Sequence, residues 1–152
     1  MVITLAKALK LKNKLIGKIS KISEDITSYN STLASNEVEV DVRLLMEKRQ
    51  DLLEKLIDLK YFISTANAPI QKSIFRMSEL KGTVAFLKKI NTKQGKVLDR
   101  YSLDVEGEYK SVFRKNDIDK MIDDIQLEID NIQETLEHHN YNTIISIDIN
   151  VE

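Results

Sequence analysis

The sequence predicts an α+β fold that is predominantly helical: long antiparallel, coiled-coil-like helices with a small β-hairpin and a C-terminal strand. Apolar residues recur at steps of 4, 3, 4, 3 and 4 residues from Ile118 to Leu136, and a similar register runs through 5–33. That spacing is typical of helices that pack along one narrow seam. Apolar and polar residues alternate instead over 97–115 and 144–151, as they do in strands.

The first two helices are expected over about 3–33 and 42–66. Residues 34–41 interrupt the apolar register between them, and Asp41 is a suitable N-cap for the second helix. The main apolar stripe of the second helix is widened by Met46, Leu53 and Ile57. This width predicts more than one neighbour for that helix.

The only proline, Pro69, predicts a kink or reversal, because a proline pushes the residue before it out of the helical region. A third helix is expected to follow over about 70–91. A fourth is expected over about 117–139, capped by Asn116 or Asp117 and ended by a turn at 140–143. No repeat or linker divides the chain, so a single domain over 1–152 is expected.

The alternating stretch at 97–115 is expected to form a hairpin with its turn at Glu106-Gly107. One face would be apolar and aromatic, and the other would be mostly charged. The apolar face comprises Val97, Tyr101, Leu103, Val105, Tyr109 and Phe113. The C-terminal strand at about 144–151 is either a third strand of this sheet or an exposed edge that pairs with another subunit.

The overall composition is that of an ordinary globular protein, with 42% hydrophobic and 31% charged residues. The 23 basic and 24 acidic residues nearly cancel, so neither nucleic acid nor an anionic membrane is expected as a partner. There is no cysteine, which excludes disulfides and thiolate metal sites. The longest apolar run is only Val84 to Leu87, so the protein is expected to be cytoplasmic.

The charges are nevertheless uneven along the chain. Residues 1–22 carry six lysines and no acid, whereas residues 117–137 carry eight acids and one lysine. One interpretation is that the first and fourth helices lie side by side. The other is that the lysines bind phosphate or lipid headgroups; these are Lys7, Lys10, Lys14, Lys18 and Lys21.

No catalytic motif is present, and we expect neither an enzyme nor a cofactor. The acidic helix could be read as a metal site, but bundle di-metal sites require Glu-x-x-His pairs, which the chain lacks. The adjacent His138 and His139 diverge by about 100° on a helix and are poorly placed to share one ion. No metal is therefore expected, and a solvated acidic face is favoured.

The best candidate for a ligand site is the hairpin. Arg100, Lys110 and Arg114 could bind an anion, and Tyr101 or Tyr109 could stack on a base. The alternative is a solvated sheet face with its aromatic residues in the core.

Parts of the chain resemble the septicolysin-like family of small, helical bacterial proteins. The residues that carry the resemblance are Leu5-Ala6-Lys7-Ala8-Leu9, Ile63 with Asn67, the run Ile118, Ile122, Ile125, Glu128, Ile129, Asp130, Ile132 and Gln133, and Asn140-Tyr141-Asn142-Thr143. The resemblance implies a helical scaffold, oligomerisation and a bacterial or phage source. It supplies no catalytic residues, and the lack of cysteine departs from the thiol-activated cytolysin that the family name suggests.

Two functional hypotheses follow. The first is a non-enzymatic, self-associating helical protein, a homo-oligomer that acts as a scaffold or interaction module. The alternative is an oligomer that binds a small anionic or nucleotide-like ligand, such as a phage protein that sequesters a host signal. A third class, membrane attachment through the basic first helix, predicts vesicle binding that weakens with salt.

Overall fold

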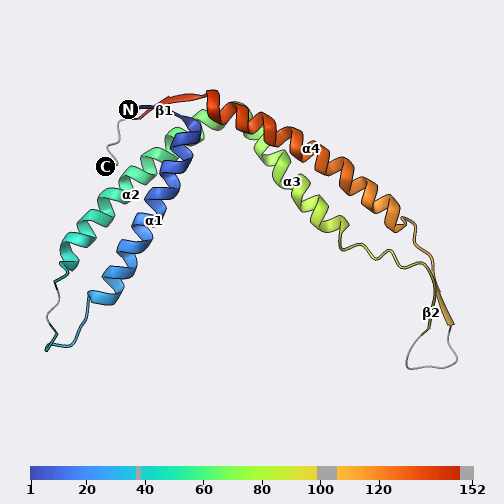
Figure 1. Ribbon diagram of the computed structural model, residues 1–152, viewed down its shortest axis with the longest axis horizontal. Coiled ribbons are helices and arrows are strands. Elements are labelled where there is room, and N and C mark those ends of the chain that lie inside the picture. Colours follow the sequence, from blue (N-terminus) through green and yellow to red (C-terminus); the bar gives the residue numbers. More distant parts are fainter. Residues whose placement is uncertain (37–38, 99–105, 148–152) are drawn as a thin grey trace. The chain divides into compact units, whose positions relative to one another are not determined.

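The computed structural model describes residues 1–36, 39–98 and 106–147, and it confirms the predominantly helical α+β class (Figure 1). The elements in chain order are β1 (Val2–Thr4), α1 (Leu5–Tyr29), α2 (Val42–Asn67), the 3₁₀ turn η1 (Ala68–Ile70), α3 (Gln71–Leu87), β2 (Gly95–Leu98), β3 (Glu106–Tyr109), α4 (Lys115–Asn142) and β4 (Ile144–Ser146).

The chain forms two compact units. Residues 1–70 and the segment from Glu137 onward make the first unit, and residues 71–136 make the second. Helix α4 contributes residues to both. The single domain expected from the sequence stays a prediction.

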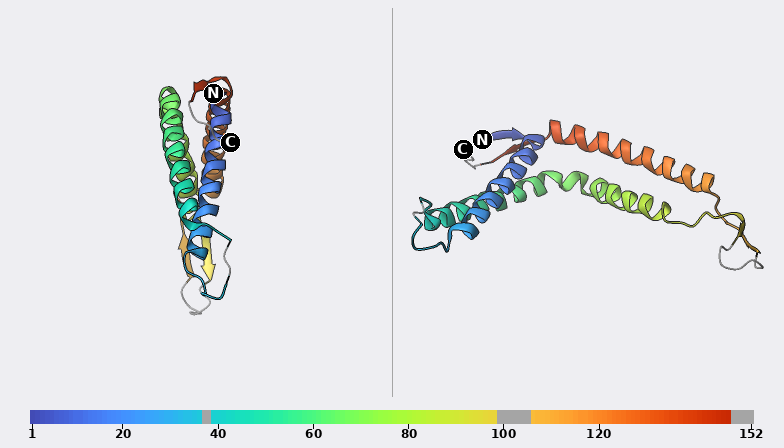
Figure 2. Two further views of the ribbon diagram at one scale, coloured as in Figure 1. Left: turned by 90° about the vertical axis from the view of Figure 1, so that its left-hand side faces the viewer. Right: turned by 60° about the horizontal axis from the view of Figure 1, so that its bottom comes forward.

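In the first unit, α1 and α2 lie side by side as a helical hairpin (Figures 1 and 2). Their facing seams are buried, whereas the sequence had favoured the helix at 117–139 as the neighbour of the first helix. This agrees with the rule that elements consecutive in the chain are usually neighbours in space. The buried residues are Leu5, Ala8, Leu15 and Ile22 of α1 and Leu52, Leu56, Leu59 and Ile63 of α2.

Both helices begin at a side-chain cap. Asp41 Oδ1 accepts hydrogen bonds from the backbone amides of Arg43 (3.0 Å) and Leu44 (3.1 Å), which confirms the predicted cap of α2. Thr4 Oγ1 accepts one from the amide of Lys7 at 3.3 Å, so α1 starts after residue 4 rather than at residue 3. Helix α1 also ends at Tyr29, four residues earlier than expected, and Leu33 lies exposed beyond it.

Strand β4 pairs antiparallel with β1, with Ile145 opposite Ile3. The proposal that the C-terminal strand joins the hairpin sheet is therefore wrong. Strand β1 was not predicted, since three residues are too few to show a period. Ile3, Ile145 and Ile147 point inward and join the core of the α1–α2 hairpin, whereas Val2 and Ile144 are exposed. The predicted residues 148–151 lie outside the described part of the chain.

In the second unit, the seams of α3 and α4 are less deeply buried. Val84 and Leu87 of α3 and Ile118, Ile129 and Leu136 of α4 are buried, and the other seam residues are half-buried. Arg76 of α3 forms an ion pair with Glu128 of α4. The hydrogen bond and charge of Glu128 raise the pKa of Arg76.

The limits of α3 and α4 differ from those expected. Helix α3 ends at Leu87 instead of about 91. Helix α4 begins at Lys115 and runs through the predicted turn to Asn142, where the Asn142 side-chain amide donates to the His138 carbonyl at 2.8 Å. The sequence misread this end because asparagine is common both in turns and at helix termini.

The hairpin exists, but its predicted turn is wrong. Glu106 and Gly107 lie within β3, where they pair with Leu98 and Val97. The connection falls in 99–105, outside the described residues. Phe113 was expected on the apolar strand face; it lies beyond β3 and is exposed. Gly107 indicates a turn in the sequence, but a glycine within a strand can also pair with the neighbouring strand.

Candidate functional site

The β2–β3 hairpin holds Tyr109 at the end of its second strand, opposite Gly95. Gly95 has φ +90°, in the left-handed region that favours glycine, so the chain can enter the strand there without strain. The Lys93 ammonium lies 5.5 Å from the centroid of the Tyr109 ring, within the range of a cation–π contact. The face of Tyr109 therefore already accepts a cation.

Of the five predicted ligand-binding residues, the structure describes three. Tyr109, Lys110 and Arg114 are all exposed, and Lys110 directly follows β3. The backbone amide of Arg114 donates to Asp117 Oδ2 at 2.9 Å at the start of α4. Arg100 and Tyr101 lie outside the described residues, so the full predicted constellation stays a prediction.

Sequence reasoning missed two contributors to this region. Lys93 reaches Tyr109, and Gln94 Oε1 accepts hydrogen bonds from the amide (2.9 Å) and hydroxyl (3.0 Å) of Ser111. Both contacts join the two ends of the hairpin: Lys93 and Gln94 precede β2, Tyr109 ends β3 and Ser111 follows it. The correct strand register would have suggested them, because Gly95 pairs with Tyr109.

The structure shows the surroundings of two sites considered from the sequence: the acidic residues of α4 as metal ligands and the lysines of α1 as a binding site for lipid headgroups. On α4, Asp119 is paired with Lys115 at 2.8 Å, and across the described residues no group of three or more His, Cys, Asp or Glu side chains could hold a metal ion. The main apolar seam of α1 is packed against α2.

His139 makes contacts that its neighbour lacks. Its Nε2 lies 3.1 Å from the Ala66 carbonyl at the end of α2, and its Nδ1 lies 3.3 Å from the Thr143 hydroxyl. A carbonyl only accepts, so Nε2 carries the proton. His139 thus links the end of α4 to the end of α2 by a hydrogen bond, whereas the side chain of His138 is exposed.

The outer surface of the α1–α2 hairpin carries exposed apolar residues. Ile16 on α1 is 44% exposed, and Met46 and Ile57 on α2 are 51% and 50% exposed. Met46 and Ile57 are two of the three residues that widen the apolar stripe of the second helix, and Ile16 adds an exposed apolar residue on the first helix. That α2 has more than one neighbour therefore stays a prediction. The exposure of Met46 and Ile57 shows that a surface for a second neighbour is accessible.

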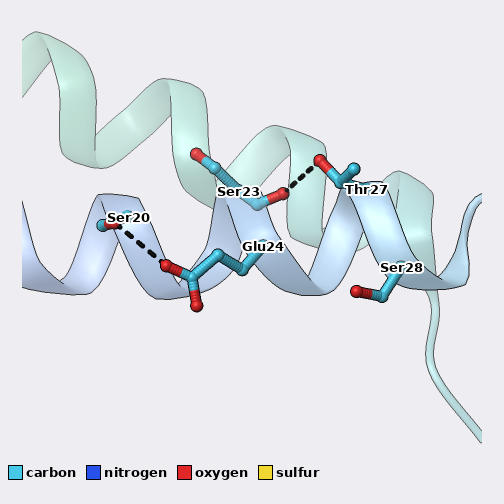
Figure 3. A pocket seen from close by; sticks show the side chains of 5 residues that line it. All are labelled: Ser20, Ser23, Glu24, Thr27 and Ser28. Carbon is cyan, nitrogen blue, oxygen red and sulfur yellow. Dashed lines mark hydrogen bonds between the residues drawn. The ribbon is translucent and has the colours of Figure 1, made fainter.

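Hollows open on the described surface of this hairpin. One, of about 320 Å³, lies along α1 beside Ser20, Ser23, Glu24, Thr27 and Ser28 (Figure 3). Another, of about 490 Å³, lies near the α1–α2 connection and combines carboxylates with apolar side chains. It is lined by Asp25, Tyr29, Glu39, Val40, Asp41, Leu44 and Leu45.

Within the described residues, no helix is both long and apolar enough to cross a membrane. Comparisons with known proteins found no matching family model, no matching curated protein and no matching solved structure. The resemblance to the septicolysin-like family therefore stays a prediction.

Proposed function

We propose that this protein is a non-enzymatic, self-associating helical protein that acts as a scaffold or interaction module. The observation that carries the proposal is the exposure of large apolar side chains along the helices of both units. Besides Ile16, Met46 and Ile57 in the first unit, the second unit exposes Phe75, Phe86 and Leu127, each more than 60% accessible.

Contiguous exposed apolar surface is rare on soluble monomers and marks an interaction site. A two-helix hairpin can shield only one seam per helix, because each helix has a single long neighbour. The remaining apolar residues gain a partner when hairpins from several copies pack together. A homo-oligomer covers these residues with a single kind of interface, since the same surface of every copy takes part in the contact.

Light scattering on the full chain at tens of micromolar tests this proposal. We expect a molar mass of at least twice the 17.5 kDa of one chain. A single 17.5 kDa species at that concentration would reject self-association.

A second candidate function is binding of a small anionic or nucleotide-like ligand at the hairpin. It is favoured by the exposed ring of Tyr109, which already holds a cation on its face, next to Lys110. A thermal-shift screen with nucleotides tests it, because a ligand that binds only the folded state raises the melting temperature. Binding that is absent, or that survives both Arg100→Ala and Arg114→Ala, would remove this candidate.

A further inference from the structure

Each helix of the α1–α2 hairpin carries a second seam beside the buried one. On α1 and on α2 alike, this second seam runs at steps of 4, 3, 4, 3 and 4 residues, and apolar residues hold five of its twelve positions, namely Leu9, Ile16, Met46, Leu53 and Ile57. We define the second seams by their residues: Leu9, Asn13, Ile16, Ser20, Ser23 and Thr27 on α1, and Met46, Gln50, Leu53, Ile57, Lys60 and Ser64 on α2.

The two second seams lie on the same side of the hairpin. Arg49 Nε of α2 donates a hydrogen bond of 2.8 Å to Ser23 Oγ of α1, so these side chains emerge on one common face. Residues four and eight positions after Arg49, which are Leu53 and Ile57, stay close to that face, as does Ile16, two turns before Ser23.

The contact between Arg49 and Ser23 also shows which residues of α1 and α2 lie at the same height, that is, at the same position along the axis of the hairpin. Ile16 lies seven residues before Ser23, a rise of about 10.5 Å, and Ile57 lies eight residues after Arg49, a rise of about 12 Å. Because the two helices run in opposite directions, both steps lead the same way along the hairpin. Ile16 and Ile57 therefore sit at nearly the same height.

We propose that this face binds the same face of a second copy, so that two α1–α2 hairpins form a four-helix bundle in which α1 of each copy lies over α2 of the other. This inference rests on the proposed self-association and names its surface. In this arrangement Ile16 packs against the partner's Ile57, and Ile57 packs against the partner's Ile16. Both helices then have two neighbours, as the wide stripe of α2 predicts.

The hollow along α1 suits this packing. The arrangement brings the partner's Leu53 and Met46 to the heights of Ser20 and Thr27, where small side chains leave room for large ones (Figure 3). The hydroxyls of Ser23 and Thr27 donate to the carbonyls of Ile19 (2.7 Å) and Ser23 (2.8 Å). Apolar side chains can cover them without leaving unsatisfied donors.

Charge selects the orientation of the second copy. The edge of α1 that points away from α2 carries three lysines and one acid, Lys10, Lys14, Lys21 and Glu24, and the corresponding edge of α2 carries Glu47, Glu54 and Asp58. Across the described residues none of these seven forms an ion pair. With α1 over the partner's α2, the mainly lysine edge lies beside the carboxylate edge on both sides, and only Glu24 comes near another acid, the partner's Glu47. With α1 over the partner's α1, lysines would face lysines and acids would face acids.

Sedimentation equilibrium of wild-type protein, Ile57→Glu and Leu44→Glu tests the surface. A charge buried at the proposed contact raises the dissociation constant by about a hundredfold or more. Leu44→Glu is the matched control, since Leu44 is 59% exposed on the opposite side of the same helix and should leave association within about threefold. Unchanged association of Ile57→Glu would overturn this inference and leave self-association standing. A monomeric wild type would overturn both.

Cross-linking tests the orientation and does not depend on how Ile57→Glu folds. The chain contains no cysteine, so Ile16→Cys and Ile57→Cys each introduce a single thiol. When the two variants are co-expressed and treated with a short bis-maleimide, we expect the mixed pair to be the main cross-linked product. Ile16→Cys linked mainly to itself would show α1 lying over α1 and would overturn the proposed arrangement, as would the absence of any mixed product.

Discussion

Arg49 of α2 reaches across the hairpin and donates from Nε to Ser23 Oγ of α1 at 2.8 Å. This side-chain hydrogen bond links the two helices in the half nearer to the α1–α2 connection, and it is only partly buried. A partly solvated hydrogen bond of this kind contributes modestly to stability. The buried apolar seam supplies most of the stability of the hairpin. The contact between Arg49 and Ser23 identifies which faces of α1 and α2 lie on the same side of it.

Leu59→Ala should destabilise the protein strongly. Leu59 is fully buried between α1 and α2, and its truncation loses apolar burial and leaves a cavity. We expect the free energy of unfolding to fall by about 2–5 kcal/mol. Urea titration followed by circular dichroism measures it, with Leu44→Ala on the exposed side of α2 as control. Equal effects of the two variants would contradict the assigned packing.

Ile145→Ala and Ile144→Ala should differ although the residues are adjacent in β4. Ile145 is 8% exposed and joins the core, whereas Ile144 is 66% exposed. Truncation of Ile145 should cost about 2–4 kcal/mol of unfolding free energy, and truncation of Ile144 less than about 0.5 kcal/mol. The same urea titration distinguishes them, and the reverse order would mean that the β1–β4 register is shifted by one residue.

Asp41→Ala should weaken the start of α2. The carboxylate accepts from the amides of Arg43 and Leu44, which have no partner inside the helix. We expect a loss of about 1 kcal/mol in unfolding free energy. Asp41→Asn, which keeps a capping oxygen, should retain most of the stability. Equal losses for the two substitutions would show that capping is not the cause.

His139→Ala should destabilise the junction between the ends of α4 and α2, whereas His138→Ala should not. His139 bonds the Ala66 carbonyl and the Thr143 hydroxyl, and the exposed His138 does neither. The expected loss is about 1 kcal/mol for His139→Ala. Amide hydrogen exchange at residues 64–67 should rise in that variant alone, and unaltered exchange there would refute the role assigned to His139.

The helices could be predicted from the sequence because a helical seam is a local signal. Leu15 and Ile22, or Leu52 and Leu59, repeat within a few turns, and Asp41 marks a start by its own chemistry. Which helix packs against each seam cannot be predicted from the local sequence, because it depends on residues far away in the chain. The charges of the first and fourth helices suggest that these two pair, but α1 packs against α2, the next helix in the chain.

The strands were harder to predict, because pairing depends on residues far apart in the sequence. Val2 pairs with Ser146, and three residues of β1 carry too short a pattern to be recognised. In the other sheet, Gly107 was read as a turn residue, whereas the glycine with positive φ is Gly95. The contact between Lys93 and Tyr109 in the candidate ligand site follows only once that register is known.

The molar mass of the full wild-type chain over a rising concentration series decides whether this protein self-associates. Sedimentation equilibrium should give masses that are multiples of 17.5 kDa from the low micromolar range upward. A mass of 17.5 kDa at every concentration up to tens of micromolar would contradict self-association and leave the exposed seams of α1 and α2 without a partner of their own kind.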